Sequence, residues 1–142
     1  IQSLIAIGIE VRKEDVNITL LGLIDADTII SELAEADVYV HTAIIDNSPN
    51  SLCEAQLIGC PIISTNVGGI PQLIDDGCSG ILFPYNEPHT LAFPLMDIFG
   101  NQEKMEYLSK NEINISHMRH DPQKIAARLK NIYSNIISQS GE

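Results

Sequence analysis

The sequence predicts an α/β fold in which a mostly parallel β-sheet carries helices on both faces. Short runs rich in Val, Ile and other apolar residues alternate with stretches whose apolar residues recur at helical spacing. Strands that alternate with helices are typical of crossover units, and such units build a parallel sheet that is covered on both sides. The remainder of the chain has helical spacing alone, so an all-helical C-terminal tail completes the predicted fold.

Length and composition indicate a single domain over residues 1–142, with residues 87–142 as its helical tail. Hydrophobic residues make up 44% of the chain and charged residues 19%, which is ordinary for a folded protein. Nineteen acidic residues against 8 basic ones give a net charge of −11, which argues against a nucleic-acid partner. One phosphate pocket remains compatible with this charge, because backbone amides at a helix N-terminus bind anions without basic side chains.

Cysteine usage and the start of the chain bear on its location. The three cysteines, Cys53, Cys60 and Cys78, are an odd number without C-x-x-C spacing, which favours a reduced cytoplasmic protein. The N-terminal residues do not resemble a signal peptide, and no apolar run approaches the ~18 residues that suggest a membrane span. Because the chain does not begin with Met, we expect it to be a piece of a longer protein.

The N-terminal part predicts two helices and two strands. Residues 1–7 predict the end of a helix, which Gly8 closes in the left-handed conformation. Residues 16–22 are β-branched and predict a strand. Residues 25–37 combine Asp caps with helical spacing, and residues 38–42 predict the next strand.

The middle of the chain continues this alternation. Residues 50–58 predict a helix that ends at Gly59, and residues 61–65 predict a strand. Residues 68–77 lie between glycines and predict a short helix, and residues 80–83 predict a further strand.

The tail predicts three helices, over residues 86–100, 101–120 and 121–138. Pro94 predicts a bend in the first of them. The third opens with Asp121 as its cap and Pro122 at its first helical position, where the missing N–H costs nothing.

The stretch D-N-S-P-N-S-L-C-E-A, residues 46–55, is the strongest candidate for a ligand site. It follows the strand over residues 38–42, and in doubly wound sheets ligands bind beyond the carboxyl ends of the strands. Asn50 and Ser51 can cap the helix that follows, whose free amides then offer partial positive charge to a phosphate.

Two carboxylates flank this helix start. Glu54 lies one turn into the helix, and its two oxygens suit a pair of adjacent hydroxyls such as a ribose diol. Asp46 lies at the mouth of the loop and can accept hydrogen bonds from a second polyol. The pattern fits a phosphate between two hydroxyl-bearing rings, as in a nucleotide sugar. The alternative is structural, since polar residues before a helix and a Glu in its first turn stabilise many helices without a ligand.

The paired glycines Gly68 and Gly69 are a second candidate feature. Glycines after a strand allow positive φ and close approach of the backbone to a ligand. The alternative is a plain strand-to-helix turn, in which Pro71 fixes the first turn. The pattern is not G-x-G-x-x-G, so it gives no dinucleotide fingerprint.

The histidines predict no metal site. His117 and His120 are three residues apart on a helix, but no further ligand stands at a suitable spacing, so surface or helix-end roles are favoured. His41 ends a strand beside the candidate loop and is the histidine that we expect near the site.

Together these motifs resemble the C-terminal nucleotide-sugar-binding domain of GT-B glycosyltransferases, in the retaining group 1 family and similar to family 4. The resemblance rests on A-D-V-Y-V-H-T-A, on two acids separated by seven residues with E-A at the second, and on G-C-P-I-I-S-T-N-V-G-G-I-P-Q-L-I-D-D-G-C-S-G-I-L-F. It extends over nearly the whole chain. It implies a Rossmann-like sheet and a partial donor-binding domain that lacks its first strands.

The resemblance also implies roles for individual residues. The two acids of the family motif correspond to Asp46, which would contact the transferred sugar as the catalytic position, and Glu54, which would bind the ribose. Further donor-binding positions are Asn47, Ser48, Asn50, Ser51, Leu52, Gly68 and Gly69 for the sugar and diphosphate, and Gly22, Leu23 and Ile24 for the base. No metal or other cofactor is implied, because the nucleotide diphosphate sugar is a substrate.

Two departures from the family pattern concern the sugar end of the site. The first acid is Asp46 instead of the usual Glu, and Asn47, Ser48 and Pro49 stand where Gly-Phe-Gly is common. The family's Gly-Arg and Lys, its acceptor domain and the first strands would precede this chain. We therefore expect the strand over residues 16–22 to shift inwards, or an exposed sheet edge to pair with another copy.

The expected function is that of a donor-binding domain in a glycosyltransferase of polysaccharide biosynthesis, which transfers a sugar with retention. The fragment alone is expected to be inactive. Alternatives are a non-catalytic nucleotide-sugar-binding or assembly domain, a GT-B-type sugar-nucleotide epimerase, and an α/β domain without a small-molecule site. The expected location is the cytoplasm, with peripheral contact to the inner membrane through the parent protein as an alternative.

Overall fold

The computed structural model describes residues 19–139. The helix end predicted before Gly8 and the first part of the strand predicted over residues 16–22 lie outside the described residues. Residues 19–22 form no strand, so that part of the prediction is wrong. No strand of the described chain lies alongside them, and Leu23 just beyond them is fully exposed at 107%. A strand does not form here because, without a neighbour, its backbone groups would have no hydrogen-bond partners.

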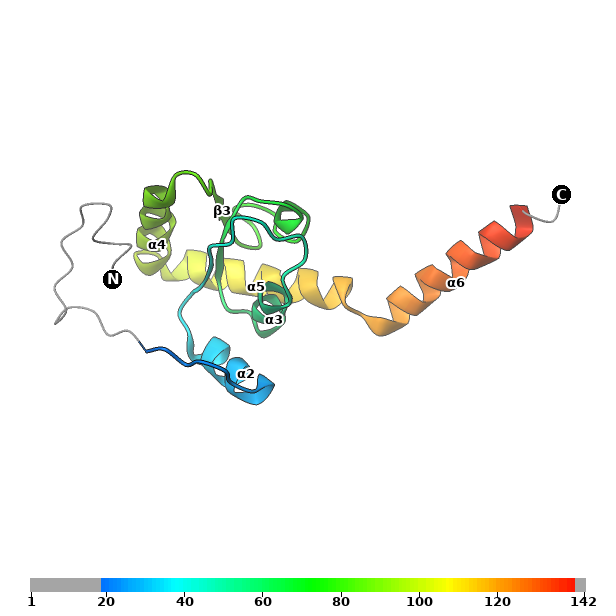
Figure 1. Cartoon of the computed structure of the whole chain (residues 1–142), viewed down its shortest axis with the longest axis horizontal. Coiled ribbons are helices and arrows are strands. Elements are labelled where there is room, and N and C mark those ends of the chain that lie inside the picture. Colours follow the sequence, from blue (N-terminus) through cyan, green and yellow to red (C-terminus); the bar gives the residue numbers. More distant parts are fainter. Residues whose placement is uncertain (1–18, 140–142) are drawn as a thin grey trace.

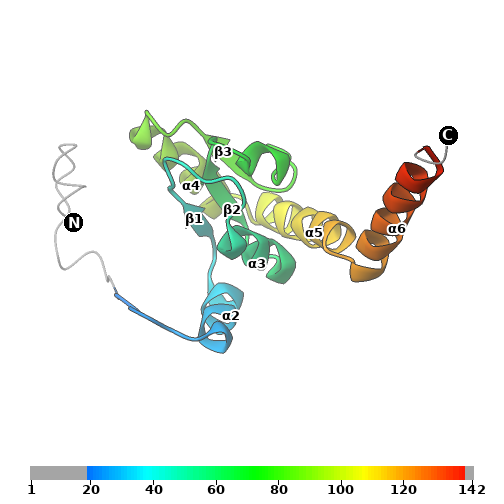
Figure 2. The same ribbon diagram turned by 45° about the vertical axis from the view of Figure 1, so that its right-hand side comes forward.

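Three short strands form one parallel sheet in the order β1-β2-β3 (Figure 2). They are β1 (Tyr39–His41), β2 (Ile62–Thr65) and β3 (Ile81–Phe83). The register pairs Tyr39 with Ile62 across β1 and β2, and Ile63 with Ile81 across β2 and β3. Each strand falls inside its predicted range, and the parallel pairing is confirmed. Within residues 19–139, no strand pairs with the outer edge of β1.

Helices cover the first face of the sheet. They are α2 (Ala26–Glu35), α3 (Asn50–Ile58) and the 3-10 turn η2 (Ile70–Gln72), which is all that forms of the short helix predicted over 68–77. As predicted, Asp25 caps α2 by accepting a hydrogen bond from the Thr28 amide at 2.8 Å, and α3 ends at Gly59 with a φ of 85°. The buried side chains on this face are Leu33, Leu52, Ala55, Cys60, Ile62, Val67, Ile70 and Ile74.

The second face packs against α4 (Ala92–Phe99) and α5 (Gln102–Arg119). Its core consists of Ile63, Phe83, Ile98 and Leu108. Neighbouring residues of a strand point to opposite faces. Because helices pack against both faces, every residue of β2 is buried, as expected for the central strand of a parallel sheet. Each fully buried Ile or Leu contributes about 1.5–3 kcal/mol to folding. The prediction of helices on both faces is confirmed.

The helix predicted over residues 86–100 is divided differently from the prediction. A 3-10 turn, η3 (Pro88–Leu91), leads directly into α4. The change from 3-10 to α-helical geometry therefore falls before Ala92 and not at Pro94. Pro94 lies in the first turn of α4, where an amide has no intrahelical partner, so its missing N–H requires no bend.

A buried carboxyl group connects α5 to the central strand. Glu112 is fully buried, and its Oε1 accepts a hydrogen bond of 2.9 Å from the Ile62 amide at the start of β2. Burial raises the pKa of Glu112 to about 9, and the hydrogen bond from Ile62 acts in the opposite direction. The carboxyl group is therefore neutral at pH 7.

The last helix, α6 (Pro122–Gln139), extends away from the sheet (Figure 1). Asp121 accepts hydrogen bonds from the amides of Gln123 and Lys124 at 2.9 and 3.2 Å, so the predicted cap is confirmed. No residue of α6 is buried. Among residues 19–139, no helix has both the length and the apolar content needed to cross a membrane.

Candidate functional site

The candidate site lies where β1 ends and a loop leads into α3. The helix begins at Asn50, with Pro49 in the extended conformation as its N-cap and no side-chain hydrogen bond to the cap. The prediction that Asn50 and Ser51 cap this helix is therefore wrong, because both already lie inside it. The first amides of α3 have no intrahelical acceptor, and the helix dipole adds partial positive charge to them. This helix start can accept an anion.

Asp46 has a polar neighbour at each carboxylate oxygen. Its Oδ1 accepts a hydrogen bond of 3.1 Å from the Ser48 amide, which is the local turn that Asp residues favour. Its Oδ2 lies 3.5 Å from Nε2 of His41. The Asp46 side chain is 30% exposed, so its remaining lone pairs are open to a ligand.

Tyr39 connects the loop to the start of α3. Its hydroxyl donates to Oγ of Ser51 at 2.8 Å and lies 3.2 Å from Nδ1 of His41. Burial raises the pKa of Tyr39, and the charges of Asp46 and Glu54 raise it further, while the hydrogen bond with Ser51 lowers it. The charges of both carboxylates therefore act on one phenol.

Glu54 itself is exposed on α3. It stands three residues after Ser51 and four after Asn50, a spacing that places all three side chains on one face of the helix. Glu54 thus lies one turn into α3 from the residues that open the helix. Asn47, Ser48 and Asn50 are also exposed, whereas Leu52 is fully buried and can offer only its backbone.

Gly68 and Gly69 pack against the loop that carries Asp46. The Gly69 amide donates to the Asp46 carbonyl oxygen at 3.1 Å. A Cβ atom on Gly68 would lie 2.1 Å from that oxygen, and one on Gly69 would lie 2.1 Å from the Asn47 carbonyl oxygen. Gly68 also has a φ of +52°. The close approach that these glycines permit is therefore to the Asp46 loop.

Gly22, Leu23 and Ile24 are not joined to this loop by any hydrogen bond between described residues. They belong to the connection that leads into α2, in which Gly22 and Leu23 are exposed and Ile24 is partly buried. Tyr39, in contrast, contacts residues of the candidate site, and the sequence pattern did not predict this. The available signal was its position two residues before His41, because residues with that spacing share one face of a strand.

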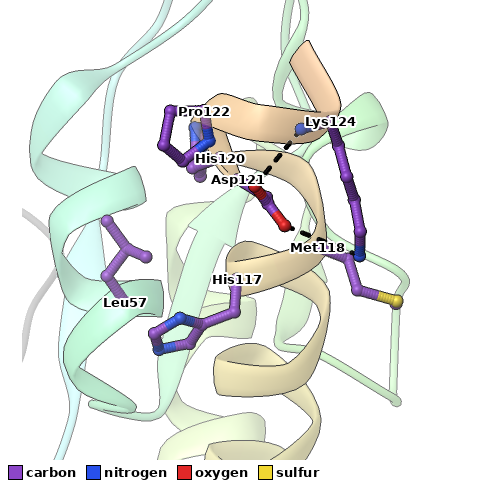
Figure 3. A pocket seen from close by; sticks show the side chains of 7 residues that line it. All are labelled: Leu57, His117, Met118, His120, Asp121, Pro122 and Lys124. Carbon is purple, nitrogen blue, oxygen red and sulfur yellow. Dashed lines mark hydrogen bonds and ion pairs between the residues drawn. The ribbon is translucent and has the colours of Figure 1, made fainter. Parts of the chain in front are cut away.

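A cavity of about 370 Å³ lies elsewhere, between the end of α3 and the junction of α5 with α6 (Figure 3). It is lined by Leu57, His117, Met118, His120, Asp121, Pro122 and Lys124. None of the predicted donor-binding residues lines it. In the part of the chain that the structure describes, no three His, Cys, Asp or Glu side chains are placed to hold a metal ion.

The parallel sheet, its helices and the loop-to-helix site define a partial Rossmann-like α/β domain. The family model of glycosyl transferases group 1 matches residues 4–101. The chain therefore belongs to the group 1 glycosyltransferase family.

Two known glycosyltransferases are similar to part of this chain. The D-inositol 3-phosphate glycosyltransferase of Paenarthrobacter aurescens is 32% identical over 85 residues, which cover 60% of this chain and 21% of that protein. The amylovoran biosynthesis glycosyltransferase AmsK of Erwinia amylovora is 31% identical over 85 residues, which cover 56% of this chain and 21% of that protein. This chain thus spans about a fifth of the length of these curated relatives.

A solved structure matches nearly the whole chain. The crystal structure of Anabaena HepE in complex with UDP and glucose superposes with a TM-score of 0.74 and 26% sequence identity. The match covers 94% of this chain and 35% of HepE. The fold is therefore part of a GT-B glycosyltransferase fold, as the sequence resemblance implies.

Proposed function

We propose that this chain binds a nucleoside diphosphate sugar and forms the donor-binding domain of a glycosyltransferase. The observation that carries the proposal is the uncapped start of α3, with Asp46 before it and Glu54 one turn into it. Family membership supports the proposal, as does the presence of UDP and glucose in the HepE structure. The acceptor is held by parts of the protein outside this chain.

In the proposed complex, the diphosphate lies at the first amides of α3. Glu54 accepts hydrogen bonds from the two ribose hydroxyls, and Asp46 accepts them from hydroxyls of the sugar. The base lies beside Gly22, Leu23 and Ile24.

Transfer breaks the bond between the anomeric carbon and the diphosphate oxygen. The acceptor oxygen forms its bond on the same face of the sugar, so the configuration is retained, and its proton passes to the departing diphosphate. The helix amides stabilise the negative charge that develops on the leaving group. The proposal assigns no general base and no metal ion to this chain.

A transfer assay on the complete protein that carries this chain tests the proposal. Glu54→Ala removes the ribose acceptor and is expected to lower kcat/KM about 10- to 100-fold, as loss of hydrogen bonds to a charged group does. Glu32→Ala, which removes an exposed acid of α2, is the matched control and should have no effect. Unchanged kcat/KM in the Glu54 variant would contradict the donor-site role.

A second candidate is a nucleotide-sugar-binding domain that does not support transfer. It is favoured by Asp46, whose side chain is one methylene shorter than the family's usual Glu and is engaged by Ser48. In that case, the wild-type protein binds the nucleotide sugar and transfers nothing. A binding assay beside the transfer assay separates the two candidates.

A further inference from the structure

We propose that His41 is a positioning residue that fixes the Asp46 carboxylate for the donor sugar, and that Tyr39 links it to the start of α3. The inference rests on the proposed function and assigns roles to two residues that the donor-binding motif does not contain. It comes from a line of four side chains: Asp46, His41, Tyr39 and Ser51.

The His41 side chain is only 14% exposed and lies between two polar groups. Its Nδ1 is 3.2 Å from the Tyr39 hydroxyl. Its Nε2 is buried, has no hydrogen-bond partner among the described residues, and lies 3.5 Å from Oδ2 of Asp46. A small inward movement of the Asp46 carboxylate turns this contact into a hydrogen bond. A buried polar atom without a partner is costly, so the contact favours such a movement.

The positions of the hydrogen atoms on these four side chains decide whether Nε2 of His41 can donate to Asp46. When the Tyr39 hydroxyl donates to Ser51, its oxygen can only accept from His41, so Nδ1 carries a proton. A lone pair on Nε2 would then point at the Asp46 carboxylate, which is unfavourable. When both hydroxyls turn round, Tyr39 donates to Nδ1 and the single ring proton sits on Nε2. The second arrangement therefore directs an Nε2–H towards Asp46.

The consequence is a carboxylate that is oriented before the sugar arrives. After that movement, the Ser48 amide binds Oδ1 and His41 binds Oδ2, and the remaining lone pairs of Asp46 stay available to the sugar. Fixing a side chain in its bound orientation lowers the entropy cost of binding. Without His41, Asp46 can rotate, and contacts to the sugar weaken. The amides of α3 and Glu54 do not depend on His41, so nucleotide affinity is preserved.

Titration calorimetry on the complete protein tests this division between sugar and nucleotide. The probes are UDP and UDP-glucose, or the GDP or ADP pair if the wild-type protein binds that pair more tightly. His41→Leu should change the Kd of the nucleoside diphosphate less than about twofold and weaken the glucose conjugate about tenfold, the effect of one charge-assisted hydrogen bond. Asp46→Asn should show the same selective loss.

Two further variants separate positioning from folding. His41→Gln keeps an N–H donor in the place of Nε2 and should restore the affinity for the conjugate to within about threefold of wild type. Tyr39→Phe keeps the ring and removes the hydroxyl. Its loss of affinity for the conjugate should therefore lie between those of His41→Leu and His41→Gln. Thermal unfolding of each variant monitors the fold.

The outcomes are distinguishable. If His41→Leu and His41→Gln both bind the conjugate as the wild type does, while Asp46→Asn does not, the role of His41 is overturned and the donor site stands. Equal losses for the nucleotide and the conjugate in both His41 variants also overturn it, because they indicate a general structural role. If Asp46→Asn has no effect, the role of Asp46 and with it this inference fail, and if no nucleotide pair binds, the proposed function itself fails.

Discussion

At the scale of single residues, the candidate site depends on two loops whose backbones lie too close for side chains. Gly68 and Gly69 fit beneath Asp46 and Asn47 because they lack a Cβ atom, and the Gly69 amide supplies one hydrogen bond to the Asp46 carbonyl oxygen. Thr65 adds another between the same segments, since its hydroxyl donates to the Ala43 carbonyl oxygen at 2.6 Å. The loop before α3 is thus supported from β2 and the turn after it.

Gly68→Ala should therefore destabilise the protein and weaken nucleotide-sugar binding. The new Cβ would meet the Asp46 carbonyl oxygen, in addition to the strain of the left-handed backbone. Gly77→Ala is the matched control, because Gly77 has a φ of +76° but no atom within 4 Å of its Cβ position. We expect about 1 kcal/mol for the control, from backbone strain alone, and at least about 2 kcal/mol more for Gly68→Ala. Urea unfolding measures both, and equal costs would argue against the loop contact.

At the scale of elements, α5 is tied to the centre of the sheet by a polar group in an apolar setting. Glu112 binds the Ile62 amide through one oxygen, while its other oxygen has no hydrogen-bond partner among the described residues. Removing such a group from water favours its neutral form. The connection between α5 and β2 therefore depends on the protonation of one carboxyl group.

Stability should fall as the pH rises from about 4.5 to about 9, the range between the ordinary pKa of a Glu and that of Glu112 in the fold. In this range the unfolded chain has lost the proton and the folded chain keeps it, so ΔG of unfolding decreases with pH. The total loss is on the order of a few kcal/mol. Glu112→Gln should flatten the profile measured by urea unfolding, whereas the exposed-site control Glu103→Gln should keep the slope. A Glu112→Gln profile as steep as that of the wild type would contradict this account.

Much at this scale could be predicted from the sequence, because periodicity and glycine positions are local signals. They located all three strands, the end of α3 at Gly59 and the cap of α6 at Asp121. The strand predicted over residues 16–22 failed within its described part because pairing depends on a neighbour that no local pattern reveals.

For the site, the sequence located Asp46 and Glu54 near one helix start. It could not predict that Pro49 would displace Asn50 and Ser51 from the cap position. It also could not predict that Tyr39 would join Ser51, because that contact spans 12 residues and depends on how α3 packs against β1.

At the scale of the whole molecule, the outer edge of β1 has no partner strand among residues 19–139. The Tyr39 amide donates to the Pro61 carbonyl oxygen of the β2 side, so the alternation of a parallel ladder directs the amide of Val40 outwards. No strand of the described chain covers this edge. Exposed edges of this kind tend to pair with other chains.

When the 142-residue chain is expressed alone, we therefore expect it to self-associate. Val40→Pro should reduce the association, because it removes an outward N–H without removing a bond to β2. Val40→Thr keeps the amide and serves as the control. Light scattering after size exclusion, over a range of concentrations, gives the mass. A wild-type chain that stays monomeric would remove the basis for edge pairing.

The central claim is that the start of α3 and Glu54 together hold a nucleoside diphosphate. Its most direct test is the Kd of UDP, GDP and ADP for the complete protein, measured by titration calorimetry for wild type, Glu54→Gln and the exposed-acid control Glu32→Gln. We predict that one of the three diphosphates binds, that Glu54→Gln weakens it at least about tenfold, and that Glu32→Gln leaves it unchanged. A Glu54→Gln variant that binds the diphosphate as tightly as the wild type would contradict the account.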